Sequence, residues 1–120
     1  VLSGDDGLTL PMLSLGAKGV VSVAANLIPR EMKALVDTFM QGKVEVAAEI
    51  NKRLYELFKL LFVETNPCPL KYLLYKFKLI PLYDVRLPLV SVSEETRLVL
   101  DTYFKRKMND MKKNITTTTI

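Results

Sequence analysis

Two adjacent carboxylates, Asp5 and Asp6, are the first side chains of this sequence that could do chemistry. A pair of carboxylates can bind a metal ion or divide the roles of general acid and general base between them. The same two residues stand where an apolar helical pattern begins, and carboxylates stabilise the positive end of a helix. We therefore interpret Asp5 and Asp6 as helix caps and assign neither of them a catalytic step.

The residue types that the chain lacks exclude several kinds of site. Its 120 residues contain no histidine and a single cysteine, Cys68. Without histidine there is no Ser-His or Cys-His nucleophile and the commonest metal ligand is missing, so we predict neither a metal nor a cofactor. One cysteine excludes an internal disulfide and fits a reducing, cytoplasmic setting. We expect Cys68 to be a small buried hydrophobic residue, and any chemistry here to use lysine, tyrosine, carboxylates or the backbone.

The basic residues gather near the C-terminal end of a chain whose net charge is +4. A nucleic-acid site needs aromatic residues interleaved with the basic ones, and only Tyr103 and Phe104 lie nearby. We therefore predict a solvated helix face and no nucleic-acid partner. Every apolar run is shorter than the roughly 18 to 20 residues of a membrane span, so we predict no membrane partner. The basic residues are Arg97, Lys105, Arg106, Lys107, Lys112 and Lys113.

The first 25 residues have the pattern of two strands joined by a helix. Residues 1–4 open in an extended, apolar style, and a helical pattern follows from Asp5 to a stop at Gly16. Residues 19–25 (GVVSVAA) form a β-branched, almost unbroken apolar run, which is typical of a parallel strand buried on both faces. This order predicts a right-handed βαβ unit.

The rest of the chain has helical periodicity. Pro29 fits the first position of a helix that Gly42 closes, and residues 44–61 form the clearest amphipathic helix. A further helix is predicted to begin with Asn66 as cap and Pro67 at its first position. We predict three parts: 1–42 as βα units, 43–108 as a helical region and 109–120 as a frayed tail.

The last predicted helix has charges that suit a helix dipole. Ser93 is expected to cap it, with Glu94 and Glu95 in its first turn and basic residues at its end. Residues 116–120 are β-prone, but they are terminal.

A parallel strand such as 19–25 needs neighbouring strands on its edges and cover on both faces. The chain supplies too few strands to meet that need, which favours the end of a larger α/β protein. The alternative is a helical domain in which the two extended segments pair only with each other.

Four stretches of this sequence, in this order, resemble the dihydrodipicolinate synthase family. They are residues 2–6 (LSGDD), 15–26 (LGAKGVVSVAAN), 61–71 (LFVETNPCPLK) and 86–90 (RLPLV). The resemblance covers nearly all of residues 1–105. N-acetylneuraminate lyases and keto-deoxy sugar acid aldolases share the superfamily but are less similar in these stretches.

The resemblance implies an α/β fold that is mostly α by residue count. The chain would be a C-terminal fragment of a (β/α)₈ TIM barrel: the end of strand 7, helix 7, strand 8, helix 8 and a C-terminal helical appendage. The family enzyme is a cytoplasmic lyase, 4-hydroxy-tetrahydrodipicolinate synthase, and a homo-oligomer, a tetramer in the family. It condenses pyruvate with L-aspartate 4-semialdehyde through a lysine imine, in lysine and diaminopimelate biosynthesis.

The resemblance also implies which residues contact substrate. Gly4 and Val21 match positions that contact the bound pyruvate imine; from the residues alone, Gly4 fits a turn and Val21 fits core packing as well as contact. The imine lysine and the tyrosine relay would lie upstream of Val1, so the isolated chain is predicted to be inactive. Lys18 and Lys71 do not match the imine lysine, and the tyrosines are expected to be packing or surface groups: Tyr55, Tyr72, Tyr75, Tyr83 and Tyr103.

Two other functions remain open at this point. One is a sister aldolase or lyase of the same superfamily that acts on another 2-keto acid. The other is a non-enzymatic helical module that binds a partner through its apolar extended segment and basic last helix.

Overall fold

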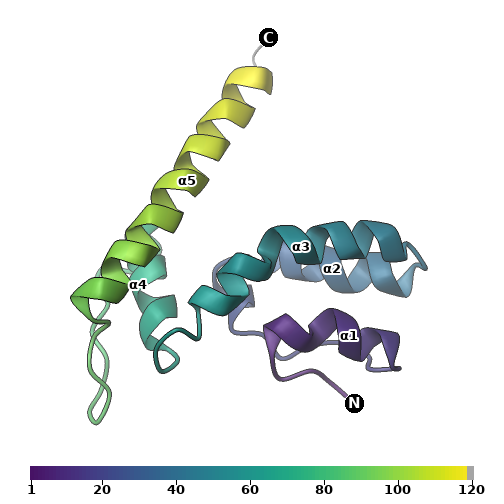
Figure 1. Cartoon of the computed structure of the whole chain (residues 1–120), viewed down its shortest axis with the longest axis horizontal. Coiled ribbons are helices and arrows are strands. Elements are labelled where there is room, and N and C mark those ends of the chain that lie inside the picture. The colour runs from purple at the N-terminus through teal and green to yellow at the C-terminus, as the bar shows by residue number, and fades with distance from the viewer. Residues whose placement is uncertain (119–120) are drawn as a thin grey trace.

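Helices make up most of the computed structural model, which describes the backbone of residues 1–118 and the side chains of residues 1–110. In Figure 1, α1, α2 and α3 lie together at one end, while α4 and the long α5 form the other end. The elements in chain order are the 3₁₀ turn η1 (Asp6–Leu8), α1 (Thr9–Ser14), the 3₁₀ turn η2 (Ala24–Asn26), α2 (Pro29–Met40), α3 (Val44–Leu60), α4 (Cys68–Lys76) and α5 (Glu94–Thr118).

The two extended segments pair with each other through a single parallel bridge between Ser3 and Val20, the only β pairing in residues 1–118. The Ser3 N–H donates to the Gly19 carbonyl at 2.9 Å, and the Val21 N–H donates to the Ser3 carbonyl at 2.8 Å. The strand predicted over 19–25 is therefore wrong beyond Val21, because residues 24–26 form η2 instead. Within residues 1–118 no further strand lies alongside, and the segment turns into η2, where the Leu27 N–H donates to the Ala24 carbonyl at 2.9 Å.

The helix predicted between Asp5 and Gly16 is present in two parts, η1 and α1. It ends as expected at Gly16, whose φ of +102° is a conformation that favours glycine. Gly42, with φ of +81°, closes α2 in the same way.

Helices α2 and α3 are antiparallel neighbours (Figure 1) and hold much of the hydrophobic core. Pro29 begins α2 as predicted, since its missing N–H costs nothing at a first helical position. The amphipathic pattern of α3 is confirmed, because its apolar face is buried, whereas Val44 at its start is 51% exposed. The buried residues of that face are Ala47, Ile50, Leu54, Leu57 and Phe58, continued by Leu61.

The start predicted for α4 is wrong by one residue. The helix begins at Cys68, Pro67 occupies the position before it, and Asn66 is exposed. The Asn66–Pro67 peptide bond is cis, and the Cys68 N–H donates to the Thr65 carbonyl at 3.0 Å, so a turn precedes the helix. Pro69 then stands in the first turn, where a proline is tolerated. Cys68 itself is buried in the core, as predicted.

The last helix begins as predicted but does not end as predicted. The Ser93 hydroxyl accepts a hydrogen bond from the Thr96 N–H at 3.2 Å, and Glu94 and Glu95 lie in the first turn. The helix then continues past the basic residues to Thr118, so its last turn holds no basic residue and the expected match to the dipole is absent there. Residues 109–118, predicted to be frayed, continue α5, and 119–120 lie outside the described residues.

Glu64 adds a second cap to α5 from the distant turn before α4. Its carboxylate accepts from the Ser93 N–H at 3.1 Å and from the Ser93 hydroxyl at 3.3 Å. Hydrogen bonding from the Thr96 side chain, and then from Ser93, holds the pKa of Glu64 below its ordinary value of 4.5. The contact ties the turn at 62–66 to the start of α5.

Glu64→Gln is expected to lower the free energy of unfolding by about 0.5 to 1 kcal/mol at pH 7. Because the folded pKa is below the unfolded one, the contribution of Glu64 is present above pH 4.5 and is lost as the pH falls through the folded pKa. Urea unfolding of wild type and Glu64→Gln from pH 7 to pH 3 measures this, with Glu49→Gln, an exposed mid-helix change, as control. A difference that stays constant over this range would refute the cap.

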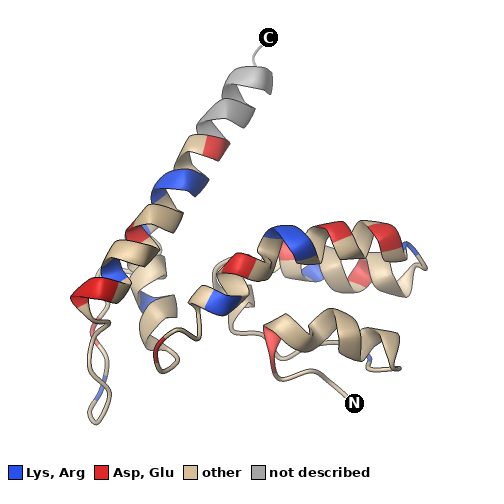
Figure 2. Cartoon of the chain, viewed as in Figure 1, with Lys and Arg blue, Asp and Glu red and all other residues tan. Residues whose placement is uncertain are grey.

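Charged residues are distributed unevenly over the fold (Figure 2). They lie along α2, α3, α4 and α5, while α1 carries none. No helix in the described residues is both long enough and apolar enough to cross a membrane.

Candidate functional site

Gly4 and Val21 lie side by side where the paired segments end. The Val21 N–H donates to the Ser3 carbonyl, so the residue after Ser3 and the residue after Val20 are held next to each other. Gly4 is exposed and Val21 is 69% exposed, so neither is packed in the core of the described chain. A Cβ added at Gly4 would meet no atom within 4 Å. We call these two residues the Gly4–Val21 edge; it offers open backbone that a small ligand could approach closely.

Side-chain hydrogen bonds fix the turn that follows Ser3. The Ser3 hydroxyl, which is buried, donates to the Asp5 carbonyl at 2.8 Å and accepts from the Asp5 N–H at 3.2 Å. Thr9, also fully buried, donates to the Ser3 hydroxyl at 3.4 Å. Ser3 and Thr9 therefore hold the backbone at Gly4 in a defined conformation.

The two carboxylates predicted to be caps have different roles. Asp5 caps η1, because its Oδ1 accepts from the Gly7 N–H at 3.0 Å. Asp6 is 1% exposed and binds the other segment instead, where its Oδ2 accepts from the Ala24 N–H at 2.9 Å and its Oδ1 accepts from the Ser22 hydroxyl. No local pattern indicates this contact, because it joins residues 18 apart and Ala24 lies in a turn within the segment predicted to be a strand.

The lysines and tyrosines named from the sequence lie away from the Gly4–Val21 edge or point into packing contacts. Lys18 is exposed, on the side of the bridge opposite to Val21, and Lys71 donates to the Asp84 carbonyl at 3.1 Å. Tyr72, Tyr75 and Tyr83 pack together, with centroids 5.0 to 6.4 Å apart. Tyr72 also donates to Asp101 at 2.7 Å, and burial followed by this contact raises its pKa.

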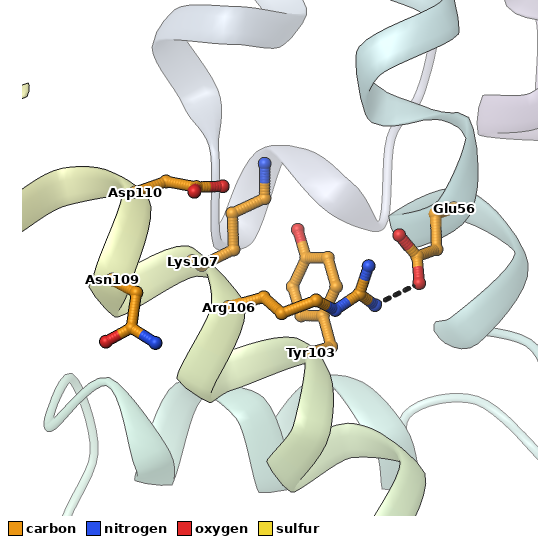
Figure 3. Close-up of a pocket in the computed structure, with 6 residues that line it drawn as sticks. All are labelled: Glu56, Tyr103, Arg106, Lys107, Asn109 and Asp110. Carbon is orange, nitrogen blue, oxygen red and sulfur yellow. Dashed lines mark hydrogen bonds and ion pairs between the residues drawn. The ribbon is translucent and has the colours of Figure 1, made fainter. Parts of the chain in front are cut away.

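A separate cleft of about 300 Å³ lies between α3 and α5 (Figure 3). Arg106 reaches from α5 to form an ion pair with Glu56 of α3. Burial raises the pKa of Tyr103 to about 12, so its phenol stays protonated at neutral pH, and the Glu56 contact raises the pKa of Arg106. The phenol is neutral and the guanidinium is paired, and we assign this cleft no catalytic step. It is lined by Glu56, Tyr103, Arg106, Lys107, Asn109 and Asp110.

A family model described as "Dihydrodipicolinate synthetase family" matches residues 1–107. The chain belongs to this family. The matched range covers the paired segments, the Gly4–Val21 edge and α1 to α4, together with about half of α5.

Curated relatives and solved structures agree with the family match. The 4-hydroxy-tetrahydrodipicolinate synthase of Sulfurihydrogenibium sp. is 49% identical over 94 residues, which is 78% of this chain and 32% of that protein. The crystal structure of dihydrodipicolinate synthase from Aquifex aeolicus has a TM-score of 0.85 at 47% identity and covers 89% of this chain and 36% of its own. The chain thus spans about a third of the length of these relatives.

One solved neighbour contains pyruvate. The chloride-inhibited dihydrodipicolinate synthase from Acinetobacter baumannii, complexed with pyruvate, has a TM-score of 0.80 at 34% identity, over 88% of this chain and 36% of its own. These neighbours are TIM-barrel enzymes of the family, and a mostly helical chain with one parallel bridge is consistent with part of such a barrel.

Proposed function

We propose that this chain is the C-terminal part of a 4-hydroxy-tetrahydrodipicolinate synthase, a cytoplasmic lyase that condenses pyruvate with L-aspartate 4-semialdehyde. Its residues would comprise the end of strand 7, helix 7, strand 8, helix 8 and the C-terminal helices of the barrel. The single parallel bridge between Ser3 and Val20 supports this placement, because neighbouring barrel strands are parallel and joined by a helix. The complete enzyme would be a homo-oligomer, in keeping with the tetramers of the family.

The observation that carries the proposal is the exposed Gly4–Val21 edge at the carboxyl end of the paired segments. Barrel active sites lie at that end of the strands. Gly4 presents backbone without a side chain, and Val21 presents a small apolar surface 69% exposed. We infer that this edge forms one wall of the pyruvate pocket, through shape and backbone contacts, while the imine lysine and the tyrosine relay come from residues outside this chain.

The choice of aldehyde is tested in the complete enzyme. We expect pyruvate-dependent turnover with L-aspartate 4-semialdehyde and, under the same conditions, at least a hundredfold lower kcat/KM with sugar aldehydes, since a site built for one polar substrate discriminates strongly against another. A coupled assay of the condensation product and a direct assay of pyruvate consumption measure the two reactions. Faster turnover with a sugar aldehyde would instead favour a sister 2-keto acid aldolase.

A further inference from the structure

Asp6 is a buried carboxylate with no part in the proposed imine chemistry. It lies two residues after Gly4, and both of its oxygens face the segment that carries Val21. Oδ1 accepts from the Ser22 hydroxyl, and Oδ2 accepts from the Ala24 N–H at 2.9 Å. A carboxylate that is only 1% exposed is costly unless such donors satisfy it, so its contacts with Ser22 and Ala24 hold the two segments firmly together.

The Asp6 carboxylate joins the two segments beyond the point where their backbone pairing ends. The hydrogen bond from the Val21 N–H to the Ser3 carbonyl is the last backbone contact of the bridge in the direction of the chain. Beyond it, Asp6 joins the segments through Ser22 and Ala24. The Gly4–Val21 edge is therefore bracketed by the backbone bridge on one side and by the carboxylate on the other.

The Ser22 hydroxyl is oriented on both sides. It donates to Asp6 and accepts from the Ala25 N–H of η2 at 2.9 Å. Because Ser22 directly follows Val21, the direction of this hydroxyl and the position of the Val21 backbone are coupled. Loss of the carboxylate would free the Ser22 side chain and the Ala24 N–H together.

We propose that Asp6 is a positioning residue: acting through Ser22 and Ala24, it sets the relative placement of Gly4 and Val21 and so the fit of pyruvate against them. This inference rests on the proposed function. Asp6 itself does not contact pyruvate; it positions the Gly4–Val21 edge, which does. A displaced wall would contact pyruvate less closely in the ground state and in the transition state alike, which raises KM.

The Asp6→Asn variant tests whether the two hydrogen bonds of Asp6, and not only its charge, position Gly4 and Val21. An amide replaces one of the two acceptor oxygens by an NH2 donor, so in Asp6→Asn one of the two present contacts must be lost or, at the Ser22 hydroxyl, reversed in direction. The matched control is Asp5→Asn, which removes the same charge one residue earlier and keeps an acceptor for the Gly7 N–H on its own turn. Asp5 makes no side-chain bond to residues 22–24.

The experiment measures KM for pyruvate, kcat and Tm in the complete enzyme for Asp6→Asn, Ser22→Ala, Ser22→Thr and Asp5→Asn. We expect Asp6→Asn and Ser22→Ala to raise KM for pyruvate about tenfold with kcat within about twofold, because saturating pyruvate still reaches the imine lysine. Ser22→Thr, which keeps the hydroxyl, should restore KM, and Asp5→Asn should behave as wild type.

A purely structural role gives a different result. A variant that only destabilises the fold loses active enzyme, so kcat or Tm falls while KM for pyruvate stays at the wild-type value, and this pattern in Asp6→Asn and Ser22→Ala overturns the inference. If Asp6→Asn fails to fold, the contrast between Ser22→Ala and Ser22→Thr decides. If the wild-type enzyme gives no pyruvate adduct after borohydride reduction, the proposed function is overturned as well. If the wild-type enzyme gives the adduct but KM for pyruvate is unchanged in Asp6→Asn and Ser22→Ala, only the role of Asp6 is overturned.

Discussion

Replacing Gly4 by alanine is expected to lower kcat/KM for pyruvate roughly a hundredfold in the complete enzyme while leaving Tm almost unchanged. The fold tolerates the methyl group, since a Cβ at Gly4 would meet no atom of this chain within 4 Å and the φ of Gly4 is not in the left-handed region. The substrate would not tolerate it, because the proposed contact uses the closeness of the backbone that only glycine allows. The Gly4→Ala variant therefore distinguishes a loss of contact with pyruvate from a loss of fold stability.

Gly19→Ala is the matched control for Gly4→Ala. Gly19 belongs to the same bridge but precedes Val20, away from the Gly4–Val21 edge, and an added Cβ would lie 3.5 Å from Leu2 Cδ2, which is ordinary van der Waals contact. We expect Gly19→Ala to keep the wild-type kcat/KM. Steady-state kinetics in pyruvate together with thermal unfolding measure both variants. A Gly4→Ala enzyme with wild-type kcat/KM would remove Gly4 from the pocket wall.

The helical part of the fold was predictable because local rules decide it. Pro29 and Gly42 mark the ends of α2 in the sequence as they do in the structure, and the spacing of apolar residues in α3 predicts the face that is buried. The capping role of Ser93 followed from its place before two glutamates. Each of these features depends on residues close together in the chain.

The errors lie where distant residues decide the structure. A β-branched run such as 19–25 predicts a strand, but strand formation needs partners, and within residues 1–118 only Ser3 supplies one. Asn66 is a good capping residue by type, yet the turn closed by the Cys68 N–H moves the start of α4 beyond it. The contacts of Asp6 with Ser22 and of Glu64 with Ser93 join residues 16 and 29 apart, and no local pattern reports them.

The candidate site was predicted only through the family resemblance. From the residues alone, Gly4 could be a turn and Val21 could be core; their exposure at one edge favours contact with a ligand but does not identify it. The resemblance implied pyruvate as the ligand; the family match over residues 1–107 confirms the family, and contact of Gly4 and Val21 with pyruvate stays a prediction. What the structure adds is the set of side chains that hold the edge: Ser3, Asp6, Thr9 and Ser22.

The 120-residue chain by itself is expected to form no imine with pyruvate, whereas the complete enzyme is expected to form one per subunit. An imine lysine must be desolvated or lie beside another cation to be neutral when it attacks. None of the lysines whose side chains the structure describes is buried, and Lys71 is engaged with the Asp84 carbonyl. Together with the family resemblance, which implies an imine lysine upstream of Val1, this leads us to expect the reactive lysine outside residues 1–120.

Borohydride reduction in the presence of pyruvate, followed by intact-mass measurement and peptide mapping, tests this account most directly. We predict a reduced pyruvate adduct on the complete enzyme, at a lysine outside residues 1–120, and no mass change on the isolated 120-residue chain. An adduct on any lysine of the isolated chain, or none on the complete enzyme, would contradict it.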